Sequence, residues 1–213
     1  PTITITSPSA GAYITNTTPT IEFQVKDTDS GVNAGTIAVT VDGTVVSTVT
    51  KTAIDGGYKC TCTSPTLKDG SHTISVNASD NDGNAAAAKT ATFTVDTVPP
   101  TLQITAPSNG LITNKKMVTV SGKTDDVSSK PVTVTVNGAT VTVGTDGTFT
   151  KDVTLVEGAN TITIVAKDKA GKTTTVTRKV TVDTSAPVIK SVTLTPNPVD
   201  CGKTFIIAVE ITD

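Results

Sequence analysis

The sequence is poor in the residues that usually fill a protein core. It has no Trp, one Met, five Leu and four Phe among 213 residues, and aromatic residues make up 3%. In their place stand 47 Thr, 28 Val and 15 Ile, more than two fifths of the chain. β-Branched side chains are restricted at χ1 and fit a pleated sheet better than a helix. The composition therefore excludes an all-α protein and indicates thin, strand-built cores of small aliphatic residues.

Long apolar runs and concentrated positive charge are also absent. The apolar runs, such as residues 205–209, are far shorter than the roughly 20 residues that a membrane-spanning helix needs, and no N-terminal segment resembles a signal peptide. The net charge is −2 and the pI about 5.4, with Lys and Arg scattered along the chain. We therefore expect neither membrane insertion nor nucleic-acid binding. The chain begins at Pro1, and we expect a monomeric segment of a longer protein.

Three phrases occur twice in the sequence, which indicates internal repetition. The paired phrases are residues 3–16 and 102–114, residues 70–83 and 158–171, and residues 94–97 and 181–184. The last pair reads Thr-Val-Asp-Thr and is followed within three residues by Pro100 or Pro187, as expected for a final strand that runs into a Pro-stiffened linker. We therefore predict two modules, residues 1–97 and 98–184, and the first two strands of an incomplete third module in residues 185–213.

Within each module, apolar and polar residues alternate with period two. Ile21, Phe23 and Val25 are separated by polar residues, as on a strand with one buried and one solvated face. Gly-containing turns, such as Asp42-Gly43 and Asn137-Gly138, separate about seven such segments per module, which predicts a β-sandwich. In the third segment we predict strands at residues 190–195 and 203–212, too few to bury a core. Either the chain stops inside a third module, which we favour, or this fragment completes its sheet with another chain.

Several phrases resemble the bacterial immunoglobulin-like repeats of surface proteins and of accessory domains on secreted glycan-active enzymes. They are residues 136–138, 146–149, 155–162 and 166–171 in the second module, and residues 29–32, 41–43, 69–70 and 80–84 in the first. The resemblance covers residues 1–184 and implies an all-β fold of tandem immunoglobulin-like sandwiches in an elongated arrangement. It implies little about activity, since such sandwiches host many roles.

Catalysis has little support in the sequence. His72 is the only histidine, and its counterpart in the second module is Asn160, so we predict a solvent-facing strand residue rather than a catalytic base. One histidine cannot build a Ser-His-Asp triad or a His-based metal cluster unless another chain contributes. Most carboxylates lie beside Gly in turns, where they accept hydrogen bonds from the backbone. We therefore predict a non-catalytic protein.

The three cysteines do not indicate a disulfide framework. Cys60 and Cys62 lie on the same face of one predicted strand, where disulfide geometry is rarely met, and Cys201 lies in the third segment. We predict that Cys60 and Cys62 are small core-facing residues without a disulfide. A Cys-x-Cys site for a soft metal is the alternative, although it needs further ligands that the sequence does not offer.

Acidic residues gather where two modules meet. In an immunoglobulin-type sandwich, a linker lies against the loops at the N-terminal end of the following module, so we expect Asp96 to approach Asp125, Asp126 and Asp168. The same end of the first module carries weaker candidates, namely Asp27, Asp29, Asp80 and Asp82. Oxygen ligands on loops are typical of Ca²⁺ sites, and the arrangement resembles cadherin-like and some bacterial adhesin repeats, in which calcium stiffens the linker. The alternative is that these carboxylates only hydrogen-bond their own turns.

Three functions are compatible with these features. The first is a structural spacer or stalk of a bacterial cell-surface or secreted multidomain protein, with adhesion to an unknown protein or glycan as its elaboration. The second is a carbohydrate-binding accessory module of a secreted enzyme, although Tyr13 and Tyr58 are the only Tyr residues available for a sugar platform. The third is an immunoglobulin-like component of a phage virion or tail, to which residues 194–199 and the unpaired cysteines have a faint similarity.

Overall fold

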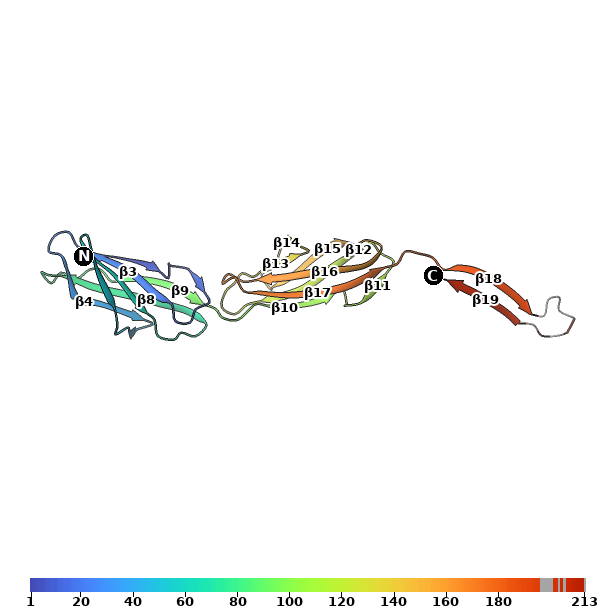
Figure 1. The fold of residues 1–213 in the computed structure, drawn as a ribbon, viewed down its shortest axis with the longest axis horizontal. Helices are drawn as coiled ribbons and strands as arrows, with labels where there is room; N and C mark the ends of the chain where they lie inside the picture. Colours follow the sequence, from blue (N-terminus) through green and yellow to red (C-terminus); the bar gives the residue numbers. More distant parts are fainter. Residues whose placement is uncertain (196–200, 203, 205, 213) are drawn as a thin grey trace.

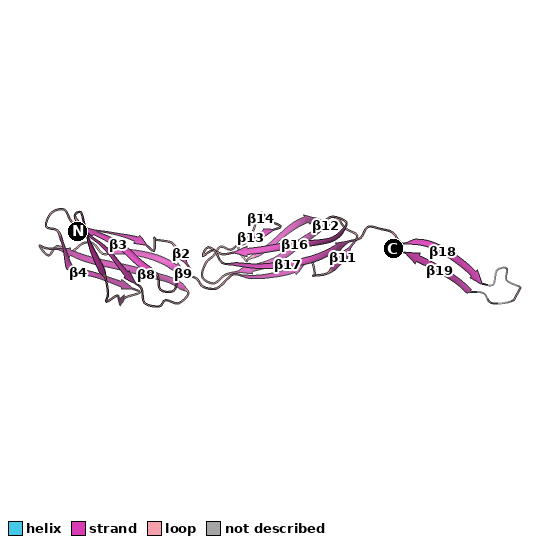
Figure 2. Ribbon diagram, in the orientation of Figure 1, coloured by secondary structure: helices cyan, strands magenta, loops and turns pink. Residues whose placement is uncertain are grey.

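The computed structural model of the chain describes residues 1–195, 201, 202, 204 and 206–212. Strands make up 61% of the structure, and the described residues contain no helix, so the predicted all-β fold is confirmed. Figure 1 shows the strands in three successive groups, β1–β9, β10–β17 and β18–β19, arranged along the long axis of an elongated molecule. Figure 2 shows the same groups coloured as strands and loops. None of the described residues forms a helix that is long and apolar enough to cross a membrane.

The first module, strands β1–β9, is a sandwich of two sheets with the strand orders β1-β3-β7-β6 and β2-β9-β8-β4-β5. Its strands are β1 (Thr2–Ser7), β2 (Tyr13–Ile14), β3 (Thr20–Lys26), β4 (Val32–Val41), β5 (Thr44–Val45), β6 (Thr50–Ile54), β7 (Gly57–Thr63), β8 (Gly70–Asp80) and β9 (Lys89–Val95). The inward faces of the two sheets enclose one hydrophobic core, in which Phe23 and Phe93 are the largest buried side chains.

The second module, strands β10–β17, has the sheet orders β10-β12-β15 and β11-β17-β16-β13-β14. Its strands are β10 (Thr101–Ala106), β11 (Leu111–Thr113), β12 (Met117–Asp125), β13 (Thr133–Val136), β14 (Ala139–Val141), β15 (Thr148–Thr154), β16 (Gly158–Lys167) and β17 (Thr173–Val182). It has its own core, in which Phe149 is the aromatic residue. Within residues 101–182, no strand corresponds to β6 of the first module, so β15 forms one edge of its sheet.

The strands form where the sequence alternates. In β3, Ile21, Phe23 and Val25 are buried while their neighbours are partly or fully exposed, and β16 buries Ile162, Ile164 and Ala166 in the same way. Side chains of a strand point alternately to its two faces, so this phase places one face of each strand in the core. The predicted period-two pattern is confirmed in both strands.

Each module's first strand is divided by a proline. β1 pairs antiparallel with β3, and after Pro8 the short β2 pairs parallel with β9. The chain makes the same change around Pro107, where β10 pairs with β12 and β11 pairs with β17. Proline has no N–H for the sheet ladder, so the chain leaves one sheet here and joins the other. This division and the short edge strands β5 and β14 give nine and eight strands, where we expected about seven.

Two of the predicted turns have the backbone that their residues require. Asp42 and Gly43 connect β4 to β5 with φ of 50° and 80°, and Asn137 and Gly138 connect β13 to β14 with φ of 48° and 82°. Two successive residues with positive φ form the type I′ turn, which suits Asn or Asp followed by Gly. The two modules thus use the same turn at corresponding hairpins.

The third group of strands is a two-stranded hairpin, β18 (Val188–Thr195) and β19 (Ile206–Thr212). Its register shifts between Ile189 and Ser191, near the start of β18, whereas the β1–β3 and β10–β12 pairs shift near the end of their first strand. Its apolar residues, including Ile189 and Ile206, are 60% and 70% exposed. Of the expected strand at 203–212, the structure describes β19 over Ile206–Thr212, while residues 203 and 205, and residues 196–200 with most of the phage-like phrase, lie outside the described residues. The division at residues 97 and 184 stays a prediction.

The cysteines of the first module face its core. Cys60 and Cys62 on β7 are 0% and 6% exposed, and neither forms a disulfide. Burial raises the pKa of Cys60 and raises that of Cys62 to about 11, so both stay protonated thiols at neutral pH. Their predicted role as small core residues is therefore confirmed. Cys201 is a free and exposed thiol.

The prediction of a solvent-facing His72 is wrong. His72 is 9% exposed, with its Nδ1 2.6 Å from Asp42 Oδ2 and its Nε2 2.7 Å from the carbonyl oxygen of Lys68. The counterpart Asn160 donates through Nδ2 to the carbonyl of Val156 at 2.8 Å. Both side chains therefore bond to the carbonyl four residues earlier. His72 and Asn160 thus make the same hydrogen bond at corresponding positions of the two modules.

Candidate metal centre at the module junction

The linker after β9 is held to the first module by hydrogen bonds. The amide of Asp96 donates to Ile14 O at 2.8 Å, and the amide of Val98 donates to Asp96 Oδ1 at 3.2 Å. The amide and hydroxyl of Thr97 donate to the two carboxylate oxygens of Asp69 at 3.0 and 2.9 Å. Sequence reasoning missed this contact, although Asp69-Gly70 recurs as Glu157-Gly158 and Thr97 as Thr184. Glu157 binds Thr184 in the same way at 2.9 and 2.7 Å.

The second module binds the linker and also contacts the first module directly. The hydroxyl of Thr174 on β17 donates to the carbonyl of Pro100 at 2.5 Å. The ammonium of Lys169, in the loop between β16 and β17, lies 5.1 Å from the centre of the Tyr13 ring on β2. A cation over an aromatic face is attracted by the ring quadrupole. Contacts on both sides therefore define how the two modules join.

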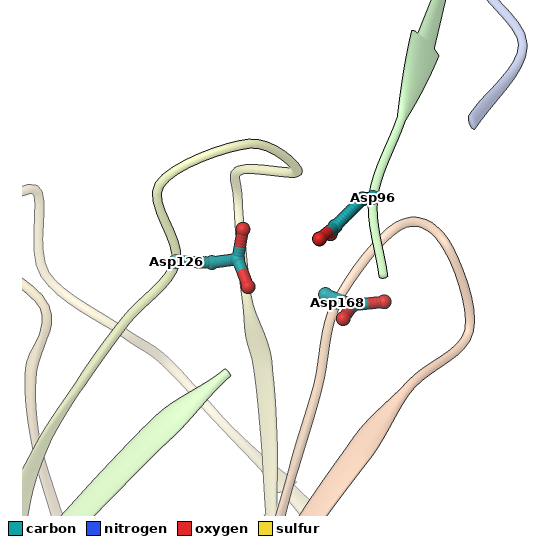
Figure 3. A group of neighbouring side chains, drawn as sticks. All are labelled: Asp96, Asp126 and Asp168. Carbon is teal, nitrogen blue, oxygen red and sulfur yellow. The ribbon is translucent and has the colours of Figure 1, made fainter. Parts of the chain in front are cut away.

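Three carboxylates meet at this junction. Asp96 follows β9, Asp126 follows β12 and Asp168 follows β16, and they are 1%, 6% and 5% exposed. One oxygen from each lies within 4.8 Å of the other two. Figure 3 shows Asp126 and Asp96 pointing toward each other, with the carboxylate of Asp168 just below that of Asp96. We call these three residues the junction triad.

Backbone amides hold one oxygen of each carboxylate. Asp126 Oδ1 accepts hydrogen bonds from the amides of Ser128 and Ser129 at 2.8 and 2.7 Å, which shapes the loop after β12. Asp168 Oδ1 accepts one from the amide of Lys172 at 2.8 Å, which closes the loop after β16. Because these bonds fix the loops, they also fix the direction of the second oxygen of each carboxylate.

The second oxygens of the triad have few partners. Asp168 Oδ2 is fully buried and has no hydrogen-bond partner in the described part of the chain. The Ser129 hydroxyl, itself 0% exposed, donates to Asp96 Oδ2 and lies 3.4 Å from Asp126 Oδ1. Sequence reasoning missed Ser129, which only the short spacing after Asp126 could have indicated. A buried acceptor without a donor is costly, so Asp168 Oδ2 needs a partner that the protein itself does not supply.

The triad also has no positive side chain of its own. Among the described residues, no Lys, Arg or His nitrogen lies within 4.0 Å of these three carboxylates. Two carboxylates 4.8 Å apart repel each other by roughly 3 kcal/mol at an effective dielectric constant of about 20. The three carboxylates, with the Ser129 hydroxyl beside Asp96 and Asp126, form an oxygen-only ligand set, which suits a hard cation rather than zinc or copper.

A cavity of about 340 Å³ lies beside Asp96 and Asp126. The linker residues Val98 and Pro99 form one wall, and the loop after β12 forms another. Asp69 also lines it. The cavity gives an ion and its water molecules room to reach the triad from solvent.

The remaining candidate of the second module, Asp125, lies outside the triad. Its side chain is 60% exposed, and its Oδ1 is 2.8 Å from Lys130 Nζ. The hydrogen bond from Lys130 lowers the pKa of Asp125. Its charge is thus compensated by a neighbouring ammonium, and the structure does not bring it together with Asp96, Asp126 and Asp168.

Two of the four candidates of the first module, Asp27 and Asp80, hydrogen-bond mainly within their own loops. Asp27 Oδ1 accepts the amides of Asp29 and Gly31 at 3.1 Å each. Its Oδ2 is 3.1 Å from the amino group of Pro1. Asp29 and Asp82 are exposed. Both carboxylate oxygens of Asp80, the counterpart of Asp168, have hydrogen-bond donors.

Asp80 shows what a closed version of the Asp168 loop looks like. Its Oδ1 accepts the amides of Asp82 and Asn84 at 3.0 and 2.7 Å, and its Oδ2 accepts Asn84 Nδ2 at 2.9 Å. The side-chain hydrogen bond from Asn84 lowers the pKa of Asp80. Lys172 stands at the position of Asn84 in the second module, and its amide makes the corresponding hydrogen bond to Asp168 Oδ1. Asp80 Oδ2 therefore has a side-chain amide donor in the first module, whereas Asp168 Oδ2 has no donor among the described residues of the second.

The two-sheet sandwiches, their strand-switching first strands and their end-to-end junction define immunoglobulin-like modules in tandem. Residues 1–76 match the family model described as bacterial Ig domain, and residues 100–184 match the model described as glucodextranase, domain B. The chain is thus a tandem of bacterial immunoglobulin-like domains. Bacillopeptidase F of Bacillus subtilis (strain 168) is 31% identical over 185 residues, which cover 87% of this chain. The chain spans 12% of the length of that protein.

Solved structures share the fold. The fibronectin(III)-like modules of Clostridium thermocellum CbhA superimpose with a TM-score of 0.51 at 21% identity, over 85% of this chain and 94% of that one. A three-immunoglobulin fragment of titin gives a TM-score of 0.51 at 12% identity, over 89% of this chain and 68% of that one. At such identities the likeness concerns the fold alone. It supports the tandem arrangement of sandwich domains.

Proposed function

We propose that the two modules form a non-catalytic spacer within a longer bacterial extracellular or cell-surface protein. The observation that carries this proposal is the junction, where the linker is hydrogen-bonded to both modules. Thr97 binds Asp69 of the first module, and Pro100 accepts a hydrogen bond from Thr174 of the second. A linker held on both sides keeps its neighbours apart at a defined distance, as a spacer requires.

The comparisons support an accessory role in a larger protein. One family model is a domain of a glucodextranase, and the relative Bacillopeptidase F is far longer than this chain. Modules of this kind thus occur as parts of longer proteins with enzyme names. We infer that the present pair positions a neighbouring catalytic or binding domain, whose protein or glycan ligand sets the biological role.

Small-angle X-ray scattering of the whole chain tests the spacer. We expect the scattering of the wild type to fit modules placed end to end. A loosened variant, Asp69→Ala with Pro99→Gly and Pro100→Gly, should show a broader and shorter distance distribution, because its linker loses hydrogen bonds and stiffness. Val98→Ala is the control, since this exposed linker side chain can be shortened without removing those contacts. A wild type as compact and variable as the loosened variant would contradict the proposal.

A further inference from the structure

We propose that the junction triad, with Ser129 beside it, binds one Ca²⁺ ion that couples the linker to the second module. The site goes beyond the spacer role, because a spacer can exist without an ion and an ion can bind without serving a spacer. The proposal rests on Asp96, Asp126 and Asp168, on their surroundings and on the difference between the two modules.

The junction triad concentrates negative charge in a buried place. Three carboxylates that are 1%, 6% and 5% exposed lie within 4.8 Å of one another. The ion pairs of the described residues do not include any of them. Buried charges in proteins are paired or coordinate metals. A divalent cation among the three oxygens would compensate the charge at the place where no side chain does.

Asp168 and its counterpart Asp80 differ in the hydrogen bonding of their second carboxylate oxygen. Asp168 Oδ2 is buried and has no donor among the residues that the structure describes, whereas the matching oxygen of Asp80 receives the side-chain amide of Asn84 at 2.9 Å. In both loops the amide of the residue four positions later donates to Oδ1 of the aspartate. Because Lys172 stands in place of Asn84, Asp168 Oδ2 remains available to a ligand. The other two carboxylates of the triad, Asp96 and Asp126, lie beside it.

The spacing and chemical type of the triad oxygens favour Ca²⁺. Ca²⁺ takes six to eight oxygen ligands at about 2.3–2.6 Å, so oxygens on opposite sides of the ion stand about 5 Å apart. The triad separations, within 4.8 Å, fit this range. Carboxylates on loops and a linker form an adaptable ligand set, which favours Ca²⁺ over Mg²⁺ with its stricter octahedron. Water molecules in the neighbouring cavity of about 340 Å³ can complete the shell.

A bound ion would link the two modules. Asp96 lies on the linker directly after β9, while Asp126 and Asp168 lie on two loops of the second module. An ion bound to all three would connect the last strand of the first module to the β12 and β16 ends of the second. Movement of the linker away from the second module would then require the ion to lose a ligand, so Ca²⁺ would restrain inter-module motion.

Calorimetric titration of Ca²⁺ into the chelator-treated whole chain is the direct test. We expect one ion per chain and a melting temperature that rises with Ca²⁺ concentration, since a ligand of the native state stabilises it. Asp168→Asn, which keeps the side-chain shape, should weaken Ca²⁺ binding by at least about tenfold. Lys172→Asn should also weaken binding, because the new amide would occupy Asp168 Oδ2 as Asn84 occupies Asp80 in the first module.

Two controls separate this site from general acidity. Asp125→Asn removes a carboxylate one residue from Asp126, and Asp80→Asn removes the counterpart of Asp168. Both should leave the stoichiometry at one ion and the affinity within about threefold, because outer charges act weakly through solvent. If wild type binds no Ca²⁺ at millimolar concentration, or if Asp168→Asn binds as well as Asp125→Asn, the site is refuted. Circular dichroism of each variant shows whether it is folded, and the spacer is judged separately from scattering without Ca²⁺.

Discussion

The two modules place one aromatic ring in the same part of their cores, but from different strands. In the first module, Phe23 on β3 lies opposite Cys60 on β7. In the second, Gly122 on β12 lies opposite Phe149 on β15. A Cβ on Gly122 would come within 2.8 Å of Phe149 Cζ, so that ring occupies the space above the glycine. A large and a small residue have exchanged strands while the filled volume is kept, which core packing tolerates better than a change at one position.

The same kind of exchange has different consequences at the module surface. At one turn of the first module Asp42 Oδ2 lies 2.6 Å from His72 Nδ1, whereas the corresponding turn of the second module carries the neutral Asn137. Asp42 Oδ1 and Asn137 Oδ1 both accept an amide of the neighbouring strand at 2.8 Å. The two turns thus share this backbone hydrogen bond, but only the turn of the first module contains a charged residue, Asp42. Loops and turns therefore differ in chemistry where the cores differ only in arrangement.

The largest effect should follow from breaking the core exchange in one module. Phe149→Ala removes a ring that is 3% exposed, and we expect a loss of about 3–5 kcal/mol in the free energy of unfolding of the second module. Both Tyr residues, Tyr13 and Tyr58, lie in the first module. Because the Tyr13 ring lies against Lys169 of the second module, the titration uses a Tyr13→Phe background, in which Tyr58 fluorescence follows the first module while circular dichroism follows both.

We expect Phe149→Ala to move the second transition seen by circular dichroism and to leave the tyrosine transition in place. Thr150→Ala, at the next and exposed position of β15, should have almost no effect. A tyrosine transition that shifts together with the other would contradict the view that the modules have separate cores.

A smaller loss should follow from Gly122→Ala. The new Cβ would lie 2.5 Å from the carbonyl oxygen of Gln103 and 2.8 Å from Phe149 Cζ. Contacts this short force backbone or ring to shift, which costs typically about 1–3 kcal/mol. The same urea titration measures it. Combining Gly122→Ala with Phe149→Leu should recover part of the loss, because a smaller side chain then faces the added methyl; no recovery would mean that the contact with Gln103 alone sets the cost.

These comparisons also show what the sequence could predict. The period-two pattern around Phe23 and the Asp42-Gly43 turn depend on neighbouring residues, and both were predicted correctly. The burial of His72 depends on Asp42, thirty residues away, and alignment with Asn160 gave the wrong expectation. At the junction, the sequence indicated Asp96, Asp126 and Asp168 but also Asp125. Side-chain positions were needed to show that Asp125 pairs with Lys130 and that the buried Ser129 hydroxyl contacts Asp96 and Asp126.

The smallest effect concerns acid stability, in which the charged pair should distinguish the modules. Partial burial raises the pKa of Asp42, but hydrogen bonds from His72 and the Thr73 amide lower it more, so its pKa lies below the ordinary value. A carboxyl group with a lowered pKa stabilises the fold above its unfolded pKa, about 3.9, and this contribution is lost as the pH falls through the folded pKa. Asn137 has no such titration.

Asp42→Asn with His72→Asn removes the charged pair from the first module. We expect the difference in unfolding free energy between pH 7 and pH 3, followed by tyrosine fluorescence, to shrink by less than about 1 kcal/mol, because the Asp42 side chain is 44% exposed and solvent screens its charge. Asn137→Asp, at the corresponding turn of the second module, is the control and should leave the acid dependence of the first module unchanged. If the double variant keeps the full acid dependence of the wild type, other carboxylates of the first module, such as Asp80 with its hydrogen bond from Asn84, must carry it instead.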